Sequence, residues 1–273
     1  ANIASSIKLR GRLVQEGVLP AVAELLNTRH PELKRWSMVT LQRLSTCTSR
    51  HGSVASTRED PEGDGYANEM LDQGVLVPML QLLRGGPQVE EDLRTLAIQS
   101  IHEMCFANDD VKLRLCKEHF ECLKVIVGLM LLDEYPGGAT QREACRVVQV
   151  LAQTSANLSA LLSAGVLAAL AVLARAEAVG KKQIAATLLH RLVSDSSENR
   201  EKMLDAGGAR TLCSLARATL PRKVVRPAVT ALVGMCALPA CVQPLLDSGC
   251  GYCLATLGTS SDPELRVDGC KAL

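Results

Sequence analysis

Aromatic side chains are scarce in this sequence: two Phe, three Tyr and one Trp make up 2% of its 273 residues. The half-buried strands of β-sandwiches and barrels draw on aromatic side chains, so this scarcity argues against an all-β fold. It also argues against modules that bind single-stranded nucleic acid, because bases stack on aromatic platforms in those modules. The 47% of residues that are hydrophobic are therefore mostly small or aliphatic.

An excess of charge of either sign is lacking as well. Thirty Lys and Arg residues oppose 29 Asp and Glu residues, which leaves a net charge of +1. A protein that neutralises a phosphate backbone needs a basic field. We therefore do not expect nucleic acid as a partner.

An uninterrupted apolar run of membrane-spanning length is also missing. Residues 147–174 contain no charged residue, which raises the question of a membrane span. A spanning helix needs about 20 predominantly apolar residues. This stretch is interrupted by six polar ones: Gln149, Gln153, Thr154, Ser155, Asn157 and Ser159. We expect a buried pair of helices here and no membrane span.

The spacing of a disulfide framework is absent, although the sequence contains 11 cysteines. An odd number of cysteines, spread over a long chain, is typical of reduced thiols in a cytosolic protein. The chain begins at Ala1 without a basic and apolar leader, so no targeting segment is expected in it. These features predict a cytoplasmic location.

Catalytic motifs are missing too. The five histidines are scattered along the chain, and none lies beside a Ser or Cys in a nucleophile motif. Gly85-Gly86 and Gly137-Gly138 are interpreted as turns between helices rather than as phosphate-binding loops. We predict that this segment is not an enzyme and holds no cofactor.

What the sequence does contain is an internal repeat. A hydrophobic residue, two mostly polar residues and a glycine precede an apolar run, as in VQEG before VLPAVAELL. This position is filled five times by glycine and once by histidine: Gly17, Gly74, His119, Gly165, Gly207 and Gly249. The spacings of 57, 45, 46, 42 and 42 residues indicate a period near 42, which belongs to helical solenoids.

Each repeat is predicted to contain three helices. The first is short and ends at the glycine, where a positive φ costs little, and the second is the apolar run. A turn follows, marked at His30-Pro31 and at Asp262-Pro263, where Asp262 is a candidate N-cap. The third helices cover WSMVTLQRLS, RTLAIQSIHEMC, REACRVVQVLA, KQIAATLLHRLV and RPAVTALVGMCA. Because no unit closes a core alone, stacked neighbours are expected to bury one apolar ribbon.

These motifs closely resemble the armadillo repeat family over essentially the whole chain. The family's motif is a glycine, an apolar second helix such as GVLPAVAELL, and a third helix carrying A-x-x-A-L-x-N-L-A, which is looser here. The related HEAT repeats are the alternative, but they usually lack the short first helix and its glycine. The resemblance implies an all-α fold: a right-handed α-solenoid of armadillo repeats, with three helices in each repeat of about 42 residues.

The repeats predict a single solenoid, which we interpret as a fragment of a longer protein because terminal repeats normally carry a polar cap. A polar insertion after the first repeat predicts a surface loop. The expected segments are 1–4 as the end of a preceding repeat, 5–47 as a repeat, 48–65 as the loop, 66–106, 107–152, 153–194 and 195–236 as repeats, and 237–273 as a truncated repeat.

A zinc site is one hypothesis for Cys250 and Cys253, with Cys236 and Cys241 nearby in the sequence. The register of the repeats favours another interpretation. Cys105 and Cys236 fall at a small-residue place near the end of the third helix, where Ala4 and Ala152 also fall. Cys145 matches Ala186 at the alanine place of the family, and Cys270 is expected there too. A thiol at such a place acts as a small hydrophobe, so we predict no metal site.

The resemblance also implies where a partner binds. In armadillo proteins the third helices line a concave groove, and the asparagine of L-x-N-L-A holds the backbone of an extended peptide. Here Asn2 keeps that asparagine, and the other matching places hold Arg43, Glu103, Val150, Arg191 and Gly234. One turn earlier, where importin-type members keep tryptophan, stand Val39, Gln99, Arg146, Thr187 and Thr230. Importin-type cargo is therefore not expected, whereas the groove arginines would attract an acidic partner unless they form a solvated helix face.

The sequence thus predicts a non-catalytic scaffold that presents this groove to a peptide or helix of a partner protein. Trp36, the single tryptophan, is either a groove residue or a core residue of its repeat. Two alternatives stay open. One is a regulatory domain that senses a metabolite in a pocket to which Arg146, His190 and Arg191 contribute. The other is a chaperone-type or cytoskeletal module of a motor or ciliary complex.

Overall fold

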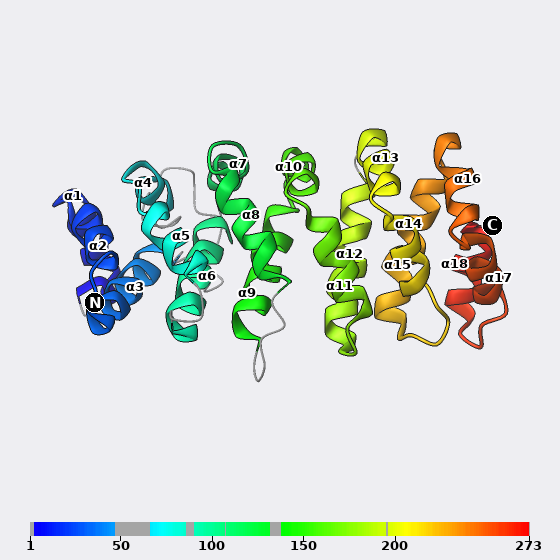
Figure 1. Cartoon of the computed structure of the whole chain (residues 1–273), viewed down its shortest axis with the longest axis horizontal. Helices are drawn as coiled ribbons and strands as arrows, with labels where there is room; N and C mark the ends of the chain where they lie inside the picture. The colour runs from blue at the N-terminus through cyan, green and yellow to red at the C-terminus, as the bar shows by residue number, and fades with distance from the viewer. Residues whose placement is uncertain are drawn as a thin grey trace. The chain divides into compact units, whose positions relative to one another are not determined.

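The computed structural model describes residues 3–46, 66–85, 90–106, 108–131, 138–194 and 196–272. The predicted loop at residues 48–65 and the asparagine at position 2 lie outside these residues. Within them the chain forms 18 α-helices and no strand, which confirms the predicted all-α solenoid (Figure 1). Contacts divide the chain into two compact units, unit 1 (Ala1–Thr154) and unit 2 (Ser155–Leu273).

Unit 1 contains three sets of three helices in the predicted order, after a 3₁₀ turn at Ile3–Ser5. The first helices are α1 (Ile7–Gln15), α4 (Ala67–Asp72) and α7 (Asp109–Lys117). The second helices are α2 (Val18–Leu26), α5 (Leu76–Arg84) and α8 (Phe120–Leu129). The third helices are α3 (Pro31–Ser45), α6 (Glu91–Phe106) and α9 (Ala139–Leu151). Because α6 packs on both α3 and α9, the third helices form one layer of the unit.

Unit 2 repeats this order, after a 3₁₀ turn at Ser155–Asn157. The first helices are α10 (Leu158–Ser163), α13 (Ser197–Asp205) and α16 (Pro239–Asp247). The second helices are α11 (Val166–Arg175), α14 (Gly208–Leu215) and α17 (Cys250–Gly258). The third helices are α12 (Val179–Ser194), α15 (Arg222–Cys236) and α18 (Pro263–Ala272). Here α15 packs on both α12 and α18.

A left-handed residue joins the first helix to the second at the predicted glycine position. The five glycines there have φ between 70° and 85°: Gly17, Gly74, Gly165, Gly207 and Gly249. Glycine adopts this conformation at little cost because it has no Cβ. His119 fills the same position before α8, and its φ of −118° is ordinary for an L-residue. The third set therefore makes its turn without a left-handed residue.

Several helix starts follow the predicted chemistry. Pro31 is the first residue of α3, where its missing N–H leaves no bond unmade. Asp262 caps α18, because its Oδ1 accepts a hydrogen bond from the backbone N–H of Glu264 at 2.9 Å. Asn108 and Ser196 cap α7 and α13 through the backbone N–H three residues on, each over 3.1 Å. These side chains satisfy N–H groups that the helices leave without a partner.

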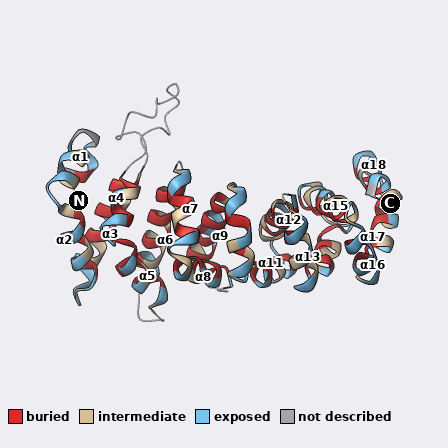
Figure 2. Cartoon of the chain, turned by 90° about the horizontal axis from the view of Figure 1, so that it is seen from above, coloured by how far each residue is buried: buried red, intermediate tan, exposed pale blue. Residues whose placement is uncertain are grey.

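Buried side chains recur in one register along the third helices. One position holds residues that are at most 2% exposed: Met38, Ile98, Cys145, Ala186 and Val229. A second position, six residues further on in each helix, is equally buried: Leu44, Met104, Leu151, Leu192 and Met235. Figure 2 shows buried residues where the helices of each unit face one another. This pattern confirms the register from which the groove positions were predicted.

The register assigns small-residue places to four cysteines: Cys105, Cys145, Cys236 and Cys270. Cys105 and Ala152 are buried at the end of their third helices, whereas Cys236 is half-buried at the same place. The expectation for Cys270 is wrong, because its side chain is exposed on α18. No third helix follows α18 among the described residues to cover that side. None of the ten described cysteines is in a disulfide.

The uncharged stretch forms helices that are packed inside their units. None of the described helices is by itself long and apolar enough to cross a membrane. Ser155–Ser163 and Val166–Arg175 reach the required length and composition only together, and they are bent by 83°. Leu161 and Leu170 of this pair are fully buried, as expected for a buried pair of helices.

Candidate functional site

The ten residues predicted to bind a partner all lie on third helices. In unit 1, Trp36 and Arg146 are exposed, and four residues are half-buried: Val39, Arg43, Gln99 and Glu103. These six residues are called the third-helix face below. The seventh predicted residue of unit 1, Val150, is only 5% exposed and offers almost no surface to a partner. Its aliphatic side chain is more stable in the core than in water.

Trp36 lies on the surface of α3. Its 54% exposure excludes the interpretation of this tryptophan as a core residue. Val39 and Arg43 follow it at intervals of one and two helical turns, so the three side chains share one side of the helix. An exposed indole beside an aliphatic and a guanidinium side chain has the composition of a binding hot spot.

A second guanidinium lies near Arg43. Arg10 of α1 donates hydrogen bonds from Nε to the carbonyl of Ala4 and from Nη1 to that of Thr46, each over 3.0 Å. Burial lowers the pKa of Arg10; Tyr66 opposes this shift and the charge of Arg43 adds to it. Two guanidiniums this close create a positive potential at this edge of the third-helix face.

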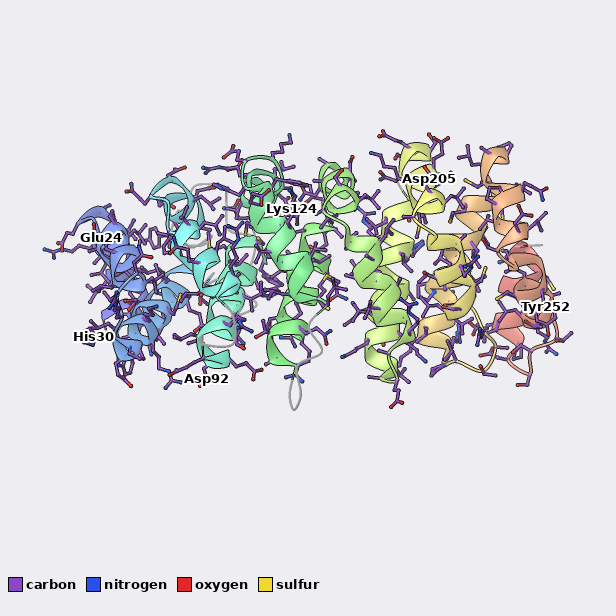
Figure 3. The ribbon with its side chains drawn as sticks, viewed as in Figure 1. Glu24, His30, Asp92, Lys124, Asp205 and Tyr252 are labelled. Atoms are coloured by element: carbon purple, nitrogen blue, oxygen red, sulfur yellow. The ribbon has the colours of Figure 1, made fainter. Side chains whose placement is uncertain are left out.

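Polar contacts connect the third helices of unit 1 to one another. Arg35 Nη2 donates to Asp92 Oδ2 over 2.6 Å, which joins α3 to the first turn of α6 (Asp92 in Figure 3). Further along the same helices, Gln42 Nε2 donates to Gln99 Oε1 over 3.3 Å. These contacts set the spacing of the helices that carry the third-helix face.

Carboxylates interrupt the basic character of this face. The side chain of Glu103 is 13% exposed, and its Oε1 lies 3.8 Å from Nδ1 of His102. Arg146 Nη1 donates to Oε1 of Glu143 over 2.9 Å on the same helix. The Arg146 side chain is 61% exposed, so its charge still reaches solvent although Glu143 offsets part of it.

The predicted residues of unit 2 form a polar surface. Thr187 and Thr230 are exposed, and Arg191 is half-buried. Burial lowers the pKa of His190, and the charge of Arg191 lowers it further. Among the described residues, Nδ1 of His190 has no hydrogen-bond partner. These residues bring no aromatic side chain, unlike α3 in unit 1.

A cavity of about 530 Å³ lies in unit 2, between the second helices α14 and α17. No acidic residue lines it, and Tyr252 on α17 is 80% exposed beside it (Figure 3). None of the three residues predicted for a metabolite pocket, Arg146, His190 and Arg191, lines this cavity. Its lining residues are Arg210, Cys213, Ser214, Arg217, Ala218, Thr219, Ser248, Gly249, Tyr252, Cys253 and Thr256.

Three thiols lie together next to this cavity. Cys250 of α17 is placed to donate to Cys213 of α14, and Cys236 of α15 to donate to Cys250. The bond from Cys250 lowers the pKa of Cys213, and the same bond and burial raise that of Cys250. Cys213 is the more exposed of the pair, so water solvates its thiolate better than that of Cys250.

Cys253 belongs to the same wall of the cavity. Its Sγ lies 3.4 Å from the carbonyl oxygens of Cys213 and Ala216 and donates to them. Burial raises the pKa of Cys253 to about 11. In the described part of the chain, no three His, Cys, Asp or Glu side chains are arranged to hold a metal ion.

Sequence reasoning did not single out Arg210, Cys213 and Arg217. A signal exists in GARTLCSLAR, where these residues follow one another at intervals of three and four. Such intervals place side chains on one side of a helix. The partner helix α17 lies some 40 residues further on, so the cavity itself is not visible in any local pattern.

Solved structures share the fold. A computationally designed armadillo repeat protein for modular peptide recognition matches 93% of this chain and 98% of its own, with a TM-score of 0.71 and 18% identity. A designed armadillo repeat protein in complex with the peptide (KR)4 matches 93% and 97%, with a TM-score of 0.69 and 19% identity. An engineered protein matches 93% and 96%, with a TM-score of 0.64 and 21% identity. No family model and no curated protein sequence matches this chain. The likeness shows that the chain has the armadillo-repeat fold.

Proposed function

We propose that this chain is a non-catalytic scaffold that binds a peptide or helix of a partner protein on its third helices. The observation that supports the proposal most directly is the exposed Trp36, with Val39 and Arg43 on the same side of α3. Designed proteins of the same fold include one made for modular peptide recognition and one in complex with a peptide. Rigid, packed helices lower the ordering cost on the scaffold's side of such a complex.

The partner segment in this proposal is acidic. Arg43 and Arg10 lie close together at one edge of the third-helix face, and Arg146 extends into solvent at another position on it. Carboxylates form charge-assisted hydrogen bonds with guanidinium groups. The designed neighbour binds the basic peptide (KR)4, so the arginines of this chain support the opposite charge preference.

The test uses Trp36 as its own reporter, because it is the single tryptophan of the chain. A peptide of Asp, Glu and Leu residues is titrated against the protein, with (KR)4 and an uncharged peptide of equal length as comparisons. We expect the acidic peptide to change the Trp36 emission and to bind most tightly. We expect Arg43→Glu to weaken its binding by about tenfold or more, as truncation of a hot-spot side chain does.

Arg12→Glu provides a matched control. This arginine lies on the first helix α1 and is highly exposed, paired with Glu16 over 3.0 Å. The substitution makes the same change in net charge as Arg43→Glu, away from the third helices. Equal binding by the two variants would refute the third-helix face as the site. Arg191→Glu tests separately whether unit 2 contributes.

A cytoplasmic location belongs to the proposal. It is supported by the absence of disulfides among the ten described cysteines, since reduced thiols persist where glutathione and thioredoxin keep the medium reducing. We expect a fluorescent fusion of the chain to spread through the cytoplasm. Accumulation in the secretory pathway would contradict this part of the proposal.

A further inference from the structure

The cavity of unit 2 combines positive charge with access to a thiol. Arg210 stands in the first turn of α14 and Arg217 two residues beyond its end, so the two arginines flank this helix. Both are exposed, and neither forms an ion pair with another described residue. Since no acidic side chain lines the cavity, it attracts anions.

The thiol of Cys213 lies between the two arginines in sequence and forms part of the cavity lining. It is half-buried, and a small molecule would approach it from the cavity. The hydrogen bond from Cys250, itself bonded by Cys236, stabilises the thiolate of Cys213 and lowers its pKa. A thiolate is the form of cysteine that attacks disulfides.

Three hydroxyl groups of the lining, those of Ser214, Ser248 and Thr256, already donate their hydrogens to backbone carbonyls and can therefore accept hydrogen bonds from a ligand. Ser214 Oγ donates its own hydrogen to the carbonyl of Thr211, and Thr256 Oγ1 to that of Cys253, each over 2.7 Å. Their free lone pairs therefore suit N–H groups of a ligand. Guanidinium groups suit carboxylates. A ligand that satisfies both sets contains carboxylates and amides, as a short acidic peptide does.

We propose that Cys213 is a thiol–disulfide exchange site for a small anionic peptide disulfide, a class that includes oxidised glutathione. Its Sγ attacks one sulfur of the disulfide, a new Sγ–S bond forms, and the original S–S bond breaks. The electron pair leaves with the other half as a thiolate, which takes a proton from water. Cys213 is oxidised and the released half of the disulfide is reduced, so the exchange needs no other oxidant. The cavity lies on second helices, so this proposal does not depend on peptide binding by the third helices.

The experiment uses the full chain with Cys47→Ser and Cys270→Ser. Cys270 is exposed and would react in parallel, and Cys47 lies outside the described residues. The protein is incubated at pH 7 with oxidised glutathione, bis(2-hydroxyethyl) disulfide or cystamine, which are anionic, neutral and cationic. Each rate is divided by the rate for the same protein unfolded in urea. We expect one adduct, mapped to Cys213 by mass spectrometry, with the anionic disulfide preferred over the neutral one by about tenfold.

Charge variants test the role of the arginines. We expect Arg210→Gln combined with Arg217→Gln to abolish the preference for the anionic disulfide, and added salt to reduce it in the parent protein. Arg175→Gln, at an exposed arginine in the last turn of α11, is the matched control and should keep the preference. An adduct that maps mainly to another cysteine, or a preference that survives the double variant, would overturn the proposal.

Cys250 is a positioning residue in this scheme, and the pH profile of adduct formation tests it. Cys250→Ala removes the hydrogen bond to Cys213. We therefore expect the midpoint of the pH profile of adduct formation to move to a higher pH than in the parent protein. Cys250→Ser restores a donor and should return the profile toward that of the parent. Identical profiles for all three proteins would overturn the role of Cys250.

Discussion

Unit 1 and unit 2 each gather several cysteines, and one of those in unit 2, Cys213, lies in an environment opposite to that of the unit 1 thiols. In unit 1, Cys105, Cys116 and Cys122 on α6, α7 and α8 are at most 3% exposed. Burial raises the pKa of Cys105 and of Cys116 to about 12, and it raises that of Cys122 as well. In unit 2, Cys213 lines a cavity, and the hydrogen bond from Cys250 lowers its pKa.

The difference teaches that position within the repeat, rather than residue type, sets the chemistry of a thiol. Cys105 lies at the end of a third helix, where the small-residue place is covered by neighbouring helices. Cys213 lies on a second helix, as the buried Cys122 does, but at a position that faces a space between repeats that opens to solvent. An apolar enclosure raises a thiol pKa, whereas a hydrogen-bond donor and solvent lower it.

The largest expected effect concerns labelling by a neutral reagent. We expect N-ethylmaleimide at pH 7.5 to label Cys213 about 100-fold faster than Cys105, Cys116 or Cys122, because labelling of a sealed thiol requires local opening. A time course of peptide mapping by mass spectrometry measures each rate. Labelling of any unit 1 cysteine within tenfold of Cys213 would remove the contrast between the two groups.

A smaller effect is expected on stability when a hydroxyl replaces each thiol. Cys105→Ser places a hydroxyl in a fully buried site, and we expect it to lower the free energy of unfolding by about 1–2 kcal/mol. Cys213→Ser keeps a polar group at a half-exposed site and should change it by less than about 0.5 kcal/mol. Urea unfolding followed by circular dichroism gives both values. Equal losses in the two variants would contradict the assignment of the two environments.

Alkaline pH should affect the contributions of Cys105 and Cys213 to stability in opposite directions. The pKa of Cys105 is raised above the ordinary 9.0, so its unfolded form ionises first and stability falls as pH rises above 9. The slope approaches about 1.4 kcal/mol per pH unit for one such thiol. Cys213, with a lowered pKa, instead contributes stability above pH 9 that is lost as pH falls through its folded value.

Urea unfolding at pH 8.5 and 10 measures this opposition. We expect Cys105→Ala to reduce the loss of stability between the two pH values, and Cys213→Ala to increase it. A loss that is the same in both variants and in the parent chain would show that these thiols do not control the alkaline response.

The smallest expected difference between the units is in the stability that a helix cap contributes, which should be the same in both. Asn108 in unit 1 and Ser196 in unit 2 each accept a backbone hydrogen bond over 3.1 Å. We expect Asn108→Ala and Ser196→Ala to cost about 1 kcal/mol each, the usual value for loss of such a cap. Chemical denaturation of both variants measures this. A cost confined to one unit would mean that the units differ in more than their thiols.

The sequence predicts the repeat register well, because it depends on local features. The glycine position and the apolar spacing of each third helix are local, and they place Cys145 and Ala186 at equivalent buried positions. The exposure of Trp36 cannot be predicted from local features, because the helical pattern of α3 is compatible with Trp36 in the core or on the surface. Val150 shows the same limit: its place in the register matches half-buried positions elsewhere, but its aliphatic side chain is buried.

The cavity of unit 2 depends on contacts between repeats, which no helical pattern contains. Cys213 and Cys250 lie 37 residues apart and meet because α14 packs on α17. The sequence suggests that Cys236, Cys250 and Cys253 are close together, yet it gives no sign that Cys213 joins them. Periodicity predicts which side of a helix is buried, but not which side chains from two repeats share a gap.

The glycine turns between the first and second helices are positions where a D-amino acid could replace glycine. At Gly165 and its four equivalents, a Cβ would meet no atom within 4 Å, so the demand for glycine comes from the positive φ alone. A D-alanine prefers that φ, and it restricts the unfolded chain more than glycine does. In five of the six sets of helices, the fold therefore offers a place where the backbone suits a mirror-image residue better than a natural side chain.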